Sequence, residues 1–455
     1  MSVITMSRTE FSRLRVMIDL ADGRTRLSRI VRRLCVRETW SVARPAIMGA
    51  AMGEADGRHT RRAVLAATGL ASAAPALAGG PPPAAPSEYG FAPGLTYLNT
   101  ASLGPTPRSI RDAMDAAWTE LETNPVGMAY GDGAVLAETD LARARIGAAL
   151  GCGPDDLLLT RSTTDAMNIF AAGTRLSEGD RVLTTDQEHE GGTYCWTNLG
   201  RRRGVAVDVI PIAPVDRDPA AILRRLAAAL QPNTRVISVS HVISATGHLM
   251  PVREIAALAR SRGVVCVVDG AQAWGQIPVD VKAIGCHAYA TTGHKWMMGP
   301  KGCGVLYLSP DAHEAIQPVQ LEAGHRFVSN STGVGCLPLA VGLGVAAEAM
   351  RQRGMERVAA HNIALRNRAY AGLARQGLKL ASAPPDDPMG TALVAAYLPE
   401  RLDSNAFRQA MHDRHNVVVK MAEKRWFNGF RLSPHLFNTE DDIDRALAAV
   451  RTELG

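Results

Sequence analysis

The sequence has few cysteines, and none of them is spaced like a set of metal ligands. Its 455 residues include seven cysteines, at positions 35, 152, 195, 266, 286, 303 and 336. They form no Cys-x-x-Cys pair and no Cys/His cluster, so the common zinc-site patterns are excluded. The number is odd, and Cys266 lies inside an apolar run typical of a buried strand. We therefore expect free thiols, no disulfide framework and no metal site.

The main part of the chain also lacks an excess of charge of one sign. The net charge is +6, but residues 1–47 alone hold ten arginines against four acidic residues. Residues 48–78 hold three arginines against two acidic residues, which leaves residues 79–455 at −1. A basic patch on a folded domain would indicate nucleic acid as a partner. Because the positive charge is confined to the N-terminal stretch, we expect no nucleic-acid partner.

The apolar run in the N-terminal part is too short, and too rich in Ala and Gly, to span a membrane. A spanning helix needs about 20 predominantly apolar residues. This run follows Arg61-Arg62 and ends in Ala76-Leu77-Ala78, an A-x-A cleavage pattern. That layout is typical of a twin-arginine signal peptide. We therefore expect export by the twin-arginine translocation machinery, a periplasmic or secreted location and no stable membrane association.

The start of this leader has two interpretations. Counted from Met48 or Met52 the leader has an ordinary length, whereas counted from Met1 it is too long. Residues 1–47 are then untranslated sequence from an early start assignment. The alternative is that the Arg-rich stretch is a disordered basic tail.

Composition and turn residues divide the chain into four parts. Apolar residues make up 46% and charged residues 21%, as in soluble globular proteins. Residues 1–78 form the Arg-rich extension and signal peptide, and the Pro- and Ala-rich residues 79–94 form a linker. Strand-like runs then alternate with helical patterns, which predicts an α/β fold with a mostly parallel sheet. We expect a large domain over residues 95–345 and a smaller C-terminal α+β domain over residues 346–455.

Short apolar runs bounded by turn residues predict the strands of this fold. They cover residues 156–160, 181–186, 205–210, 234–239, 264–268, 305–308 and 417–420. Helical patterns fill residues 134–150 and, in the bridge to the smaller domain, residues from about 338 to 353 and 355 to 376.

A lysine and an aspartate lie where a ligand is expected. The run Val264–Val268 reads as a buried parallel strand, and Asp269 follows at its carboxyl end, the edge where ligands of open α/β sheets collect. Lys295 stands alone among small residues in Thr291-Thr292-Gly293-His294-Lys295. Pyridoxal phosphate requires an amine for its Schiff base and an anion for its pyridinium nitrogen. The pair therefore predicts a pyridoxal-phosphate site.

Three segments in order resemble the class V aminotransferase family of pyridoxal-phosphate enzymes, which includes cysteine desulfurases, isopenicillin N epimerases and kynureninase. They are Asp269-Gly270-Ala271-Gln272-Ala273, Gly293-His294-Lys295 and Gly299-Pro300-Lys301-Gly302-Cys303-Gly304. Several motifs in one order make a chance match improbable. The resemblance covers about residue 95 to the C-terminus. It implies the pyridoxal-phosphate-dependent transferase fold of type I and a homodimer.

The resemblance also implies roles for individual residues. Lys295 would hold the cofactor and act as the base, Asp269 would keep the ring nitrogen protonated, and His189 would stack on the ring; these three are the expected catalytic residues. Thr332 would reach the phosphate of the neighbouring subunit. The expected cofactor contacts are Thr163, Thr164, His189, Ser244, Asp269, Gln272, Thr292, His294, Lys295 and Thr332.

Two of these assignments have plain structural alternatives. Thr163 and Thr164 stand where a strand turns into a helix, and a helix N-terminus with hydroxyl side chains can bind phosphate. From the residues alone an ordinary N-cap is the favoured interpretation, because Ser and Thr are the usual caps. For His189, taken alone, a surface histidine is the favoured interpretation, because a lone histidine in a loop is more often a surface residue. The resemblance assigns all three to the cofactor.

A second informative segment is Gly429-Phe430-Arg431-Leu432-Ser433-Pro434. The family has an arginine at the position of Arg431 that binds the substrate α-carboxylate with two parallel hydrogen bonds, which a lysine cannot reproduce. The alternative is a surface arginine in an ion pair. The resemblance therefore predicts a small amino-acid or peptide-metabolite substrate held by Arg431.

The reaction type depends on a missing residue. Cysteine desulfurases carry a nucleophilic cysteine on the loop after the strand that holds Lys420, and Met421–Phe430 contains none. We therefore expect an epimerase or aminotransferase type of reaction on an amino acid or amino-acid-bearing metabolite. The alternatives are an exported enzyme that modifies a glutamyl group of a peptide siderophore or other natural product, a cysteine desulfurase or C–S lyase, and a non-catalytic scaffold.

Overall fold

The computed structural model describes residues 86–125, 134–213, 216–312, 316–317 and 336–455, which all belong to the compact unit formed by residues 76–455. The predicted signal peptide, the linker up to residue 85 and Thr332 lie outside the described residues. In the part of the chain that is described, no helix is long and apolar enough to cross a membrane.

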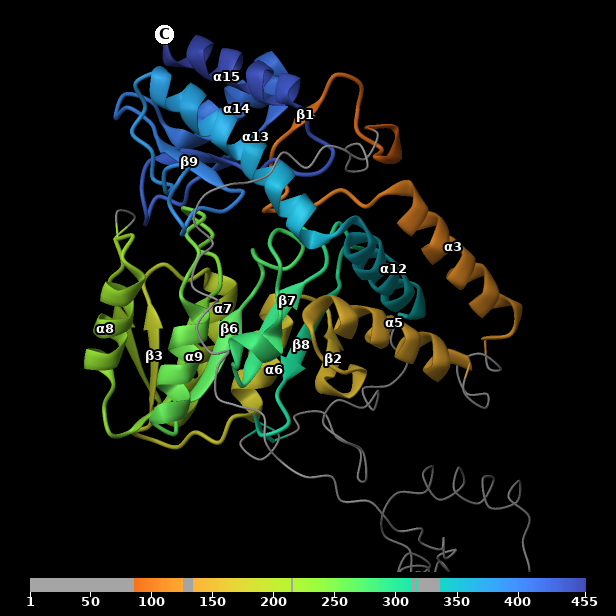
Figure 1. The fold of residues 1–455 in the computed structure, drawn as a ribbon, viewed down its shortest axis with the longest axis vertical. Coiled ribbons are helices and arrows are strands. Elements are labelled where there is room, and N and C mark those ends of the chain that lie inside the picture. Colours follow the sequence, from red (N-terminus) through yellow and green to blue (C-terminus); the bar gives the residue numbers. More distant parts are fainter. Residues whose placement is uncertain (1–85, 126–133, 214–215, 313–315, 318–335) are drawn as a thin grey trace, which may run out of the picture. The chain divides into compact units, whose positions relative to one another are not determined.

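A seven-stranded sheet forms the centre of the fold (Figure 1). Its strand order is β2-β8-β7-β6-β5-β3-β4. The five strands from β7 to β4 are parallel, whereas β8 runs antiparallel to both of its neighbours. The strands are β2 (Leu157–Thr160), β3 (Arg181–Thr185), β4 (Ala206–Ile210), β5 (Thr234–Ser240), β6 (Val265–Asp269), β7 (Ala288–Thr292) and β8 (Gly304–Leu308). The predicted α/β fold with a mostly parallel sheet is confirmed.

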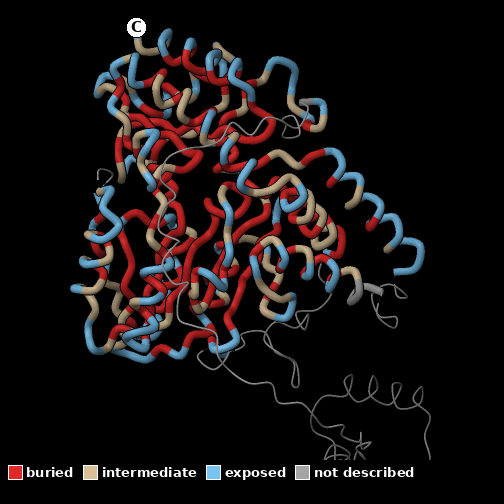
Figure 2. Tube along the Cα trace, in the orientation of Figure 1, coloured by how far each residue is buried: buried red, intermediate tan, exposed pale blue. Residues whose placement is uncertain are grey.

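Helices cover both faces of this sheet, which is why its strands read as nearly continuous apolar runs. One face packs against α6 (Thr163–Gly173) and α7 (Glu190–Arg203), and Val182, Val236 and Val267 point to that side. The neighbouring residues Leu183, Ile237 and Val268 belong to the other core. That core is covered by α5 (Ala134–Leu150), α8 (Pro219–Ala229), α9 (Val252–Ser261) and the short α10 (Val281–Ile284). Figure 2 shows the strands buried along most of their length.

The C-terminal part of the chain builds a second, antiparallel sheet of order β11-β12-β9. Its strands are β9 (Val394–Tyr397), β11 (Lys420–Met421) and β12 (Gly429–Leu432). The helices of this part are α12 (Leu337–Arg353), α13 (Met355–Arg375), α14 (Ser404–His415) and α15 (Glu440–Leu454). Apolar residues of the last three helices and of this sheet form a separate core.

The N-terminal arm joins this C-terminal part. Strand β1 (Thr96–Tyr97) pairs in parallel with β10 (Val417–Val418), and α3 (Arg108–Thr123) follows the arm. The predicted single strand over residues 417–420 is therefore wrong. Val419 separates two short strands, because β10 pairs with the arm whereas β11 pairs with β12. The chain changes sheets at this residue, and the apolar pattern of four residues carries no information on their partners.

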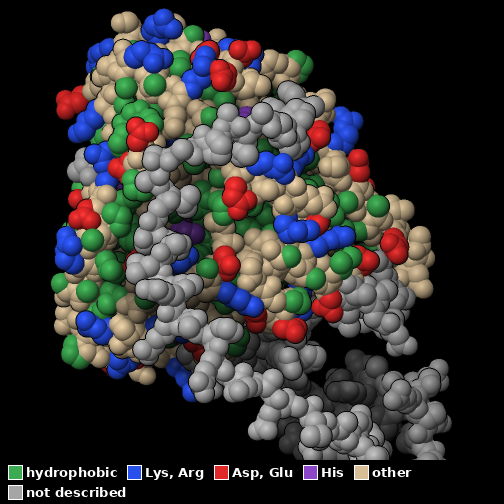
Figure 3. All heavy atoms as spheres, viewed as in Figure 1, with side chains coloured by type: hydrophobic (Ala, Val, Ile, Leu, Met, Phe, Trp, Pro, Cys, Tyr) green, Lys and Arg blue, Asp and Glu red, His purple; other side chains and the backbone are tan. Residues whose placement is uncertain are grey.

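The molecular surface in view carries charges of both signs. Figure 3 shows Lys and Arg side chains interspersed with Asp and Glu over this face. The surface also carries exposed ion pairs, such as Arg368 with Asp444 at 2.6 Å. Exposed pairs of this kind contribute about 0–1 kcal/mol each, so the stability of the fold rests on its three larger apolar cores.

Candidate active site

The carboxyl ends of the parallel strands meet at one edge of the large sheet, and a polar pocket lies there. Ser240, Asp269 and Thr292 are the last residues of β5, β6 and β7. This inner pocket is lined by Ser162, Thr163, Thr164, His189, Gly191, Ser240, Val242, Ser244, Asp269, Ala271, Gln272, Thr292, His294 and Lys295. All nine predicted cofactor contacts within the described residues are among them. The order of the strands thus brings the predicted cofactor contacts together at one edge of the sheet.

An outer pocket of about 310 Å³ continues from the inner one. The two share Thr164, His189, Ser244, Gln272, His294 and Lys295. The outer pocket adds Ala101 and Ser102 of the N-terminal arm and a group from the C-terminal sheet, which comprises Lys420, Met421, Ala422, Glu423, Trp426 and Arg431. Large sheet, arm and small sheet therefore close around one continuous cavity.

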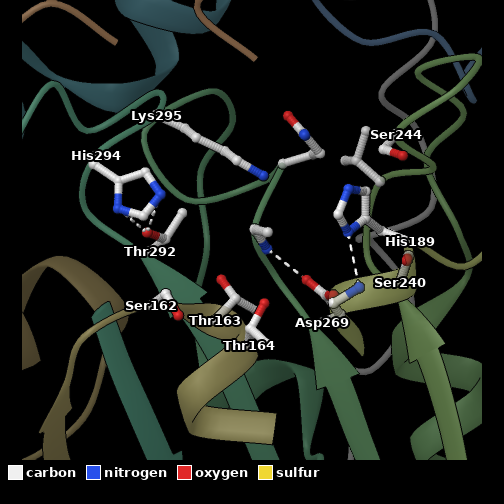
Figure 4. A pocket seen from close by; sticks show the side chains of 14 residues that line it. Ser162, Thr163, Thr164, His189, Ser240, Ser244, Asp269, Thr292, His294 and Lys295 are labelled. Atoms are coloured by element: carbon white, nitrogen blue, oxygen red, sulfur yellow. Dashed lines mark hydrogen bonds between the residues drawn. The ribbon is translucent and has the colours of Figure 1, made fainter. Parts of the chain in front are cut away.

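Lys295 extends into the centre of the inner pocket, with Thr292 and His294 on one side and His189 and Asp269 on the other (Figure 4). Burial lowers the pKa of its ammonium group to about 8, and the carboxylate of Asp269 opposes that shift. Arg431 and Lys420 lower the pKa further through like-charge repulsion. A lysine in these surroundings is partly a neutral amine near neutral pH, as a nucleophile or base requires.

Asp269 presents one of its carboxylate oxygens to the pocket. The other oxygen, Oδ1, accepts a 2.9 Å hydrogen bond from the backbone N–H of Ala271. Burial raises the pKa of this carboxyl, whereas that hydrogen bond and the charge of Lys295 lower it. Gly192 keeps the second oxygen accessible, because a Cβ atom at residue 192 would lie 2.8 Å from Oδ2. A cationic N–H group of a ligand would therefore find an unblocked acceptor here.

The ring of His189 is held in one orientation by the backbone. His189 is the N-cap of α7, and its Nδ1 accepts the N–H of Gly191 at 3.0 Å. Because Nδ1 is an acceptor, the proton of the neutral ring is on Nε2. Burial, followed by the charge of Lys295, lowers the pKa of the ring and favours this neutral form. His189 thus lines the cavity as a neutral ring with a donor at Nε2.

The N-terminus of α6 supplies hydroxyl groups that the helix itself does not use. Ser162 is the N-cap, and its Oγ accepts the N–H of Asp165 at 3.1 Å. The hydroxyl of Thr163 is buried and has no hydrogen-bond partner among the described residues. A buried polar group without a partner is costly, so this hydroxyl marks a site for a ligand acceptor or donor. The ordinary N-cap interpretation applies to Ser162 and not to Thr163 or Thr164.

Thr292 and His294 form the opposite wall of the inner pocket. The hydroxyl of Thr292 donates to the carbonyl of Cys303 at 3.0 Å, and it is 2.8 Å from Nδ1 of His294. The same hydroxyl is also 3.1 Å from Nε2 of His294, so the tautomer of the ring decides which nitrogen donates to it. Burial and the charges of Lys295 and Lys301 lower the pKa of His294 to about 4. An anion bound beside this ring would act against those two cations and favour its protonated form.

Gln272 makes two contacts that the sequence did not predict. Its Oε1 accepts Trp296 Nε1–H at 2.8 Å, and its Nε2 donates to the carbonyl of Ala101 at 2.9 Å. The side chain therefore ties the N-terminal arm to the residue that follows Lys295, and it retains one N–H for a ligand. Ser244 also has two functions, because its backbone carbonyl accepts a hydrogen bond from Arg431 while the residue lines both pockets.

Arg431 is buried, with 7% of its surface exposed, and it faces the outer pocket. Its guanidinium donates to the carbonyl of Ser244 and to the hydroxyl of Ser102 at 3.4 Å, and its Nε is buried without a partner. No carboxylate in the described part of the chain lies within ion-pair distance of it. The alternative of a surface arginine in an ion pair is wrong, because Arg431 is buried and has no ion-pair partner among the described residues.

Several residues at the site were not selected from the sequence. Ser102 belongs to an arm whose position depends on the pairing of β1 with β10. Glu188 is buried beneath the pocket, where its carboxyl accepts from Thr185 at 2.7 Å and from Ser240 at 2.5 Å, and burial raises its pKa to about 7. Glu423 enters the outer pocket from the turn after β11. Its position directly before His189 could have drawn attention to Glu188. No local sequence pattern indicates that Ser102 or Glu423 belongs to the site.

Comparison with known proteins identifies the family. The model of the aminotransferase class-V family matches residues 96–445. The chain belongs to this family. It is 31% identical over 382 residues to an isopenicillin N epimerase of Streptomyces clavuligerus, a match that covers 79% of this chain and 94% of the epimerase. It is 28% identical over 376 residues to a probable cysteine desulfurase of Methanothermobacter thermautotrophicus, a match that covers 76% of this chain and 92% of the desulfurase.

Solved structures share the fold of this class V chain. The apo structure of a cysteine desulfurase from Thermococcus onnurineus superposes with a TM-score of 0.72 at 21% identity and covers 79% of this chain and 94% of the other. A variant of the protein C-DES with glycine covalently linked to its pyridoxal-phosphate cofactor superposes with a TM-score of 0.73 at 22% identity. The match covers 80% of this chain and 98% of C-DES. The predicted fold of type I is confirmed, and the protein is a pyridoxal-phosphate-dependent enzyme of the class V family.

Proposed function

We propose that this class V enzyme acts on an amino acid, or on a metabolite that bears one, by taking and returning a proton at the α-carbon, as an epimerase or aminotransferase does, without a cysteine nucleophile. The observation that carries the proposal is the position of Lys295, Asp269 and Arg431 on the walls of one continuous cavity. An amine, an anion and an unpaired guanidinium are the three groups that such chemistry requires from the protein.

The residues of the inner pocket fit the phosphate of the cofactor. The buried Thr163 hydroxyl lacks a partner, and it stands at the N-terminus of α6, where free N–H groups and the helix dipole favour an anion. Thr164 lies in the next position, and Thr292 and His294 line the facing wall. These four residues would hold the phosphate.

The residues on the other side fit the ring. Asp269 would accept the N–H of the ring nitrogen on its free oxygen, and the neutral ring of His189 would lie against the pyridine face. Gln272, through its remaining N–H, and the Ser244 hydroxyl would contact the phenolic oxygen. When bound, pyridoxal phosphate supplies an electron sink that lowers the barrier for loss of the α-proton. The carboxylate of Asp269 supports that function because it favours the protonated ring nitrogen.

Arg431 and Lys295 would act on different parts of the substrate, the α-carboxylate and the α-proton. Arg431, with an unpaired Nε in a buried position, would bind the α-carboxylate by charge-assisted hydrogen bonds and so fix the position of the α-carbon. Lys295, with its pKa near 8, can accept a proton from that carbon as a neutral amine and return it as an ammonium group. Lys295 would serve either reaction type, because epimerisation and amino transfer both begin with removal of the α-proton.

The positions of the cysteines support the exclusion of sulfur transfer. Cys152, Cys195, Cys266, Cys286, Cys303 and Cys336 are the cysteines within the described residues, and none of them lines either pocket. Burial raises the pKa of Cys195 and of Cys303 to about 12, so neither supplies a thiolate near neutral pH. The identity to an isopenicillin N epimerase favours the epimerase branch of the family over the desulfurase branch.

We also propose that the enzyme works as a homodimer and is exported. The dimer follows from the predicted contact of Thr332 with the cofactor phosphate of a neighbouring subunit, and twofold symmetry is the commonest form of oligomer. Export follows from Arg61-Arg62 and the Ala76-Leu77-Ala78 pattern. The twin-arginine route carries folded proteins, so the cofactor can be bound before the protein leaves the cytoplasm.

Two variants test the proposal. Lys295→Ala should abolish covalent trapping of the cofactor by borohydride, read as loss of the cofactor mass on the peptide that contains residue 295. Arg431→Lys should leave trapping intact but lower kcat/KM by about tenfold or more, because a charge-assisted fork contributes about 1.5–3 kcal/mol. The substrates would be amino acids and amino-acid-bearing peptides, followed by product mass and by deuterium uptake at the α-carbon. Trapping that survives in Lys295→Ala, or desulfuration of free cysteine as the fastest reaction, would contradict the proposal.

A further inference from the structure

The outer pocket holds a second cation directly opposite Arg431. Lys420 of β11 and Arg431 of β12 are partners in the antiparallel register, so their side chains stand on the same face of the small sheet. Both residues line the outer pocket. Side chains in such a pair have Cβ atoms about 4.5–5.5 Å apart, and like charges in this arrangement destabilise a sheet. The fold therefore maintains a repulsive pair at the wall of its own active site.

No acidic side chain of the described residues forms an ion pair with either cation, although the charge of Glu423 partly offsets the repulsion. Neither Lys420 nor Arg431 has an ion-pair partner there. Glu423 is the acid that lines the same pocket, but its carboxylate is bound by Arg425 at 2.9 Å. Burial and the charge of Arg431 lower the pKa of Lys420, and the charge of Glu423 opposes that shift only in part. The outer pocket thus has an excess of positive charge.

The two cations lie at different depths. The guanidinium of Arg431 is 7% exposed and is fixed by the Ser244 carbonyl and the Ser102 hydroxyl. Lys420 is half-buried and has no hydrogen bond to any described residue, so its long side chain is not committed to a position. Two cations at different depths suit two anionic groups on one molecule better than a single shared carboxylate.

The loop that carries Glu423 is anchored beside this site. Arg425 Nη2 donates to the carbonyl of Glu188 at 3.1 Å, and Trp426 Nε1 donates to the carbonyl of Asp186 at 3.2 Å. The guanidinium of Arg425 also stacks on the Trp426 ring, 4.3 Å from its centroid. These contacts fix Arg425, the ion-pair partner of Glu423, beside the outer pocket.

We propose that the substrate is an acidic amino acid, or a metabolite bearing one, whose α-carboxylate binds Arg431 and whose second carboxylate binds Lys420. This inference rests on the proposed function, since it assigns the α-carboxylate to Arg431. It adds a specificity-determining residue, Lys420, and a substrate class with two carboxylates.

Binding of two unreactive probes to the holoenzyme tests this inference. Glutarate and its monoamide, glutaramate, have the same length and no amine, so neither reacts with the cofactor. Calorimetry should give a Kd for glutarate about tenfold lower than for glutaramate, because one charge-assisted contact is lost in the amide. Succinate and adipate, with their monoamides, extend the comparison to shorter and longer spacings between the carboxylates.

Lys420→Met should remove the preference for glutarate while glutaramate binds as before. Lys424→Met is the matched control, because Lys424 is on the same loop but is exposed and paired with Asp403 at 3.1 Å outside the pocket. The control should retain the full preference. Thermal melting and cofactor absorbance of each variant check that it is folded and loaded.

Three results would overturn the inference: equal affinity of the two probes in the unmodified enzyme, a preference that survives Lys420→Met, and equal weakening of both probes by Lys420→Met, which would indicate one carboxylate shared by the two cations. The failure of the proposed function is a separate result. It would appear as absence of cofactor trapping at Lys295, which is measured on the same preparations and does not depend on Lys420.

Discussion

Gly104 of the N-terminal arm lies against the backbone of Lys295 so closely that a Cβ atom at residue 104 would stand 2.0 Å from the Lys295 carbonyl oxygen. The N–H of Gly104 also donates to the carbonyl of His294 at 2.7 Å. The arm and the segment that carries the reactive lysine are thus in direct backbone contact.

We therefore expect Gly104→Ala to be destabilising. The methyl group would meet backbone atoms that cannot rotate away, so either the arm or the lysine segment must shift. The free energy of unfolding should fall by about 1–3 kcal/mol, as measured by denaturant titration. Gly90→Ala is the control on the same arm, since a Cβ there has no neighbour closer than 3.8 Å, and it should change stability by about 0.5 kcal/mol or less. Equal effects of the two changes would disprove the close approach.

Because the hydroxyl of Thr163 has no partner among the described residues, its removal should not lower the stability of the apoprotein but should weaken cofactor binding. Thr163→Val keeps the shape but removes the buried polar group, so the apoprotein should be as stable as the unmodified one or slightly more stable. Affinity for pyridoxal phosphate should nevertheless fall by about tenfold, because a phosphate contact is lost. Denaturation of the apoprotein and a fluorescence titration with the cofactor measure the two effects.

Thr174→Val, near the other end of the same helix, should show the reverse pattern. The hydroxyl of Thr174 donates to the carbonyl of Phe170 at 2.8 Å, so its loss should lower stability by about 1 kcal/mol and leave cofactor affinity unchanged. If Thr163→Val bound the cofactor as tightly as the unmodified protein, its hydroxyl would not be a phosphate ligand.

Attachment of the cofactor to Lys295 should depend on pH in a defined way. Only the neutral amine attacks a carbonyl, and burial brings the pKa of Lys295 down to about 8 from its ordinary 10.5. The rate at which apoprotein takes up pyridoxal phosphate should therefore rise about tenfold per pH unit below about pH 8 and level off above it. Stopped-flow absorbance over about pH 6 to 10 measures this profile. A rate that still climbs tenfold per unit near pH 10 would mean that the lysine keeps its ordinary pKa.

Export should depend on Arg61 and Arg62. Changing both to lysine preserves the charge but should stop recognition by the twin-arginine machinery, so folded precursor with bound cofactor should collect in the cytoplasm. Fractionation followed by mass spectrometry of the N-terminal peptide measures the location and checks for a mature start near Gly79. Unchanged recovery of mature protein in the periplasm would rule out this route, and a precursor without any cleavage at residue 78 would rule out the predicted signal peptide.

The centre of the large sheet could be predicted from the sequence because its strands carry a strong local signal. The apolar run before Asp269 is buried on both faces, so it ends where the strand ends and the acid falls at the ligand edge. The helix over residues 134–150 was predicted with its observed bounds, since Gly151, at φ +77°, ends it. In both segments the local residue pattern and the position in the fold predict the same element boundary.

The contacts that complete the site could not be predicted, because they join residues far apart in the chain. Ser162, Thr163 and Thr164 look alike as caps, and the structure alone shows that Ser162 takes that role. The partners of Gln272 include Ala101, which lies 171 residues away. Lys420 faces Arg431 only because β11 and β12 pair in one particular register.

The parallel pairing of Thr96 with Val417 sets an order in which the enzyme can be completed during synthesis. The arm that supplies Ser102 has no strand partner until more than 300 further residues have left the ribosome. Contacts of such sequence separation form late, because the entropy of closing a long loop must be overcome first. The large sheet can therefore fold and bind the cofactor phosphate before the outer pocket exists. A nascent chain released early would be able to hold cofactor but would lack the substrate-binding half of the cavity.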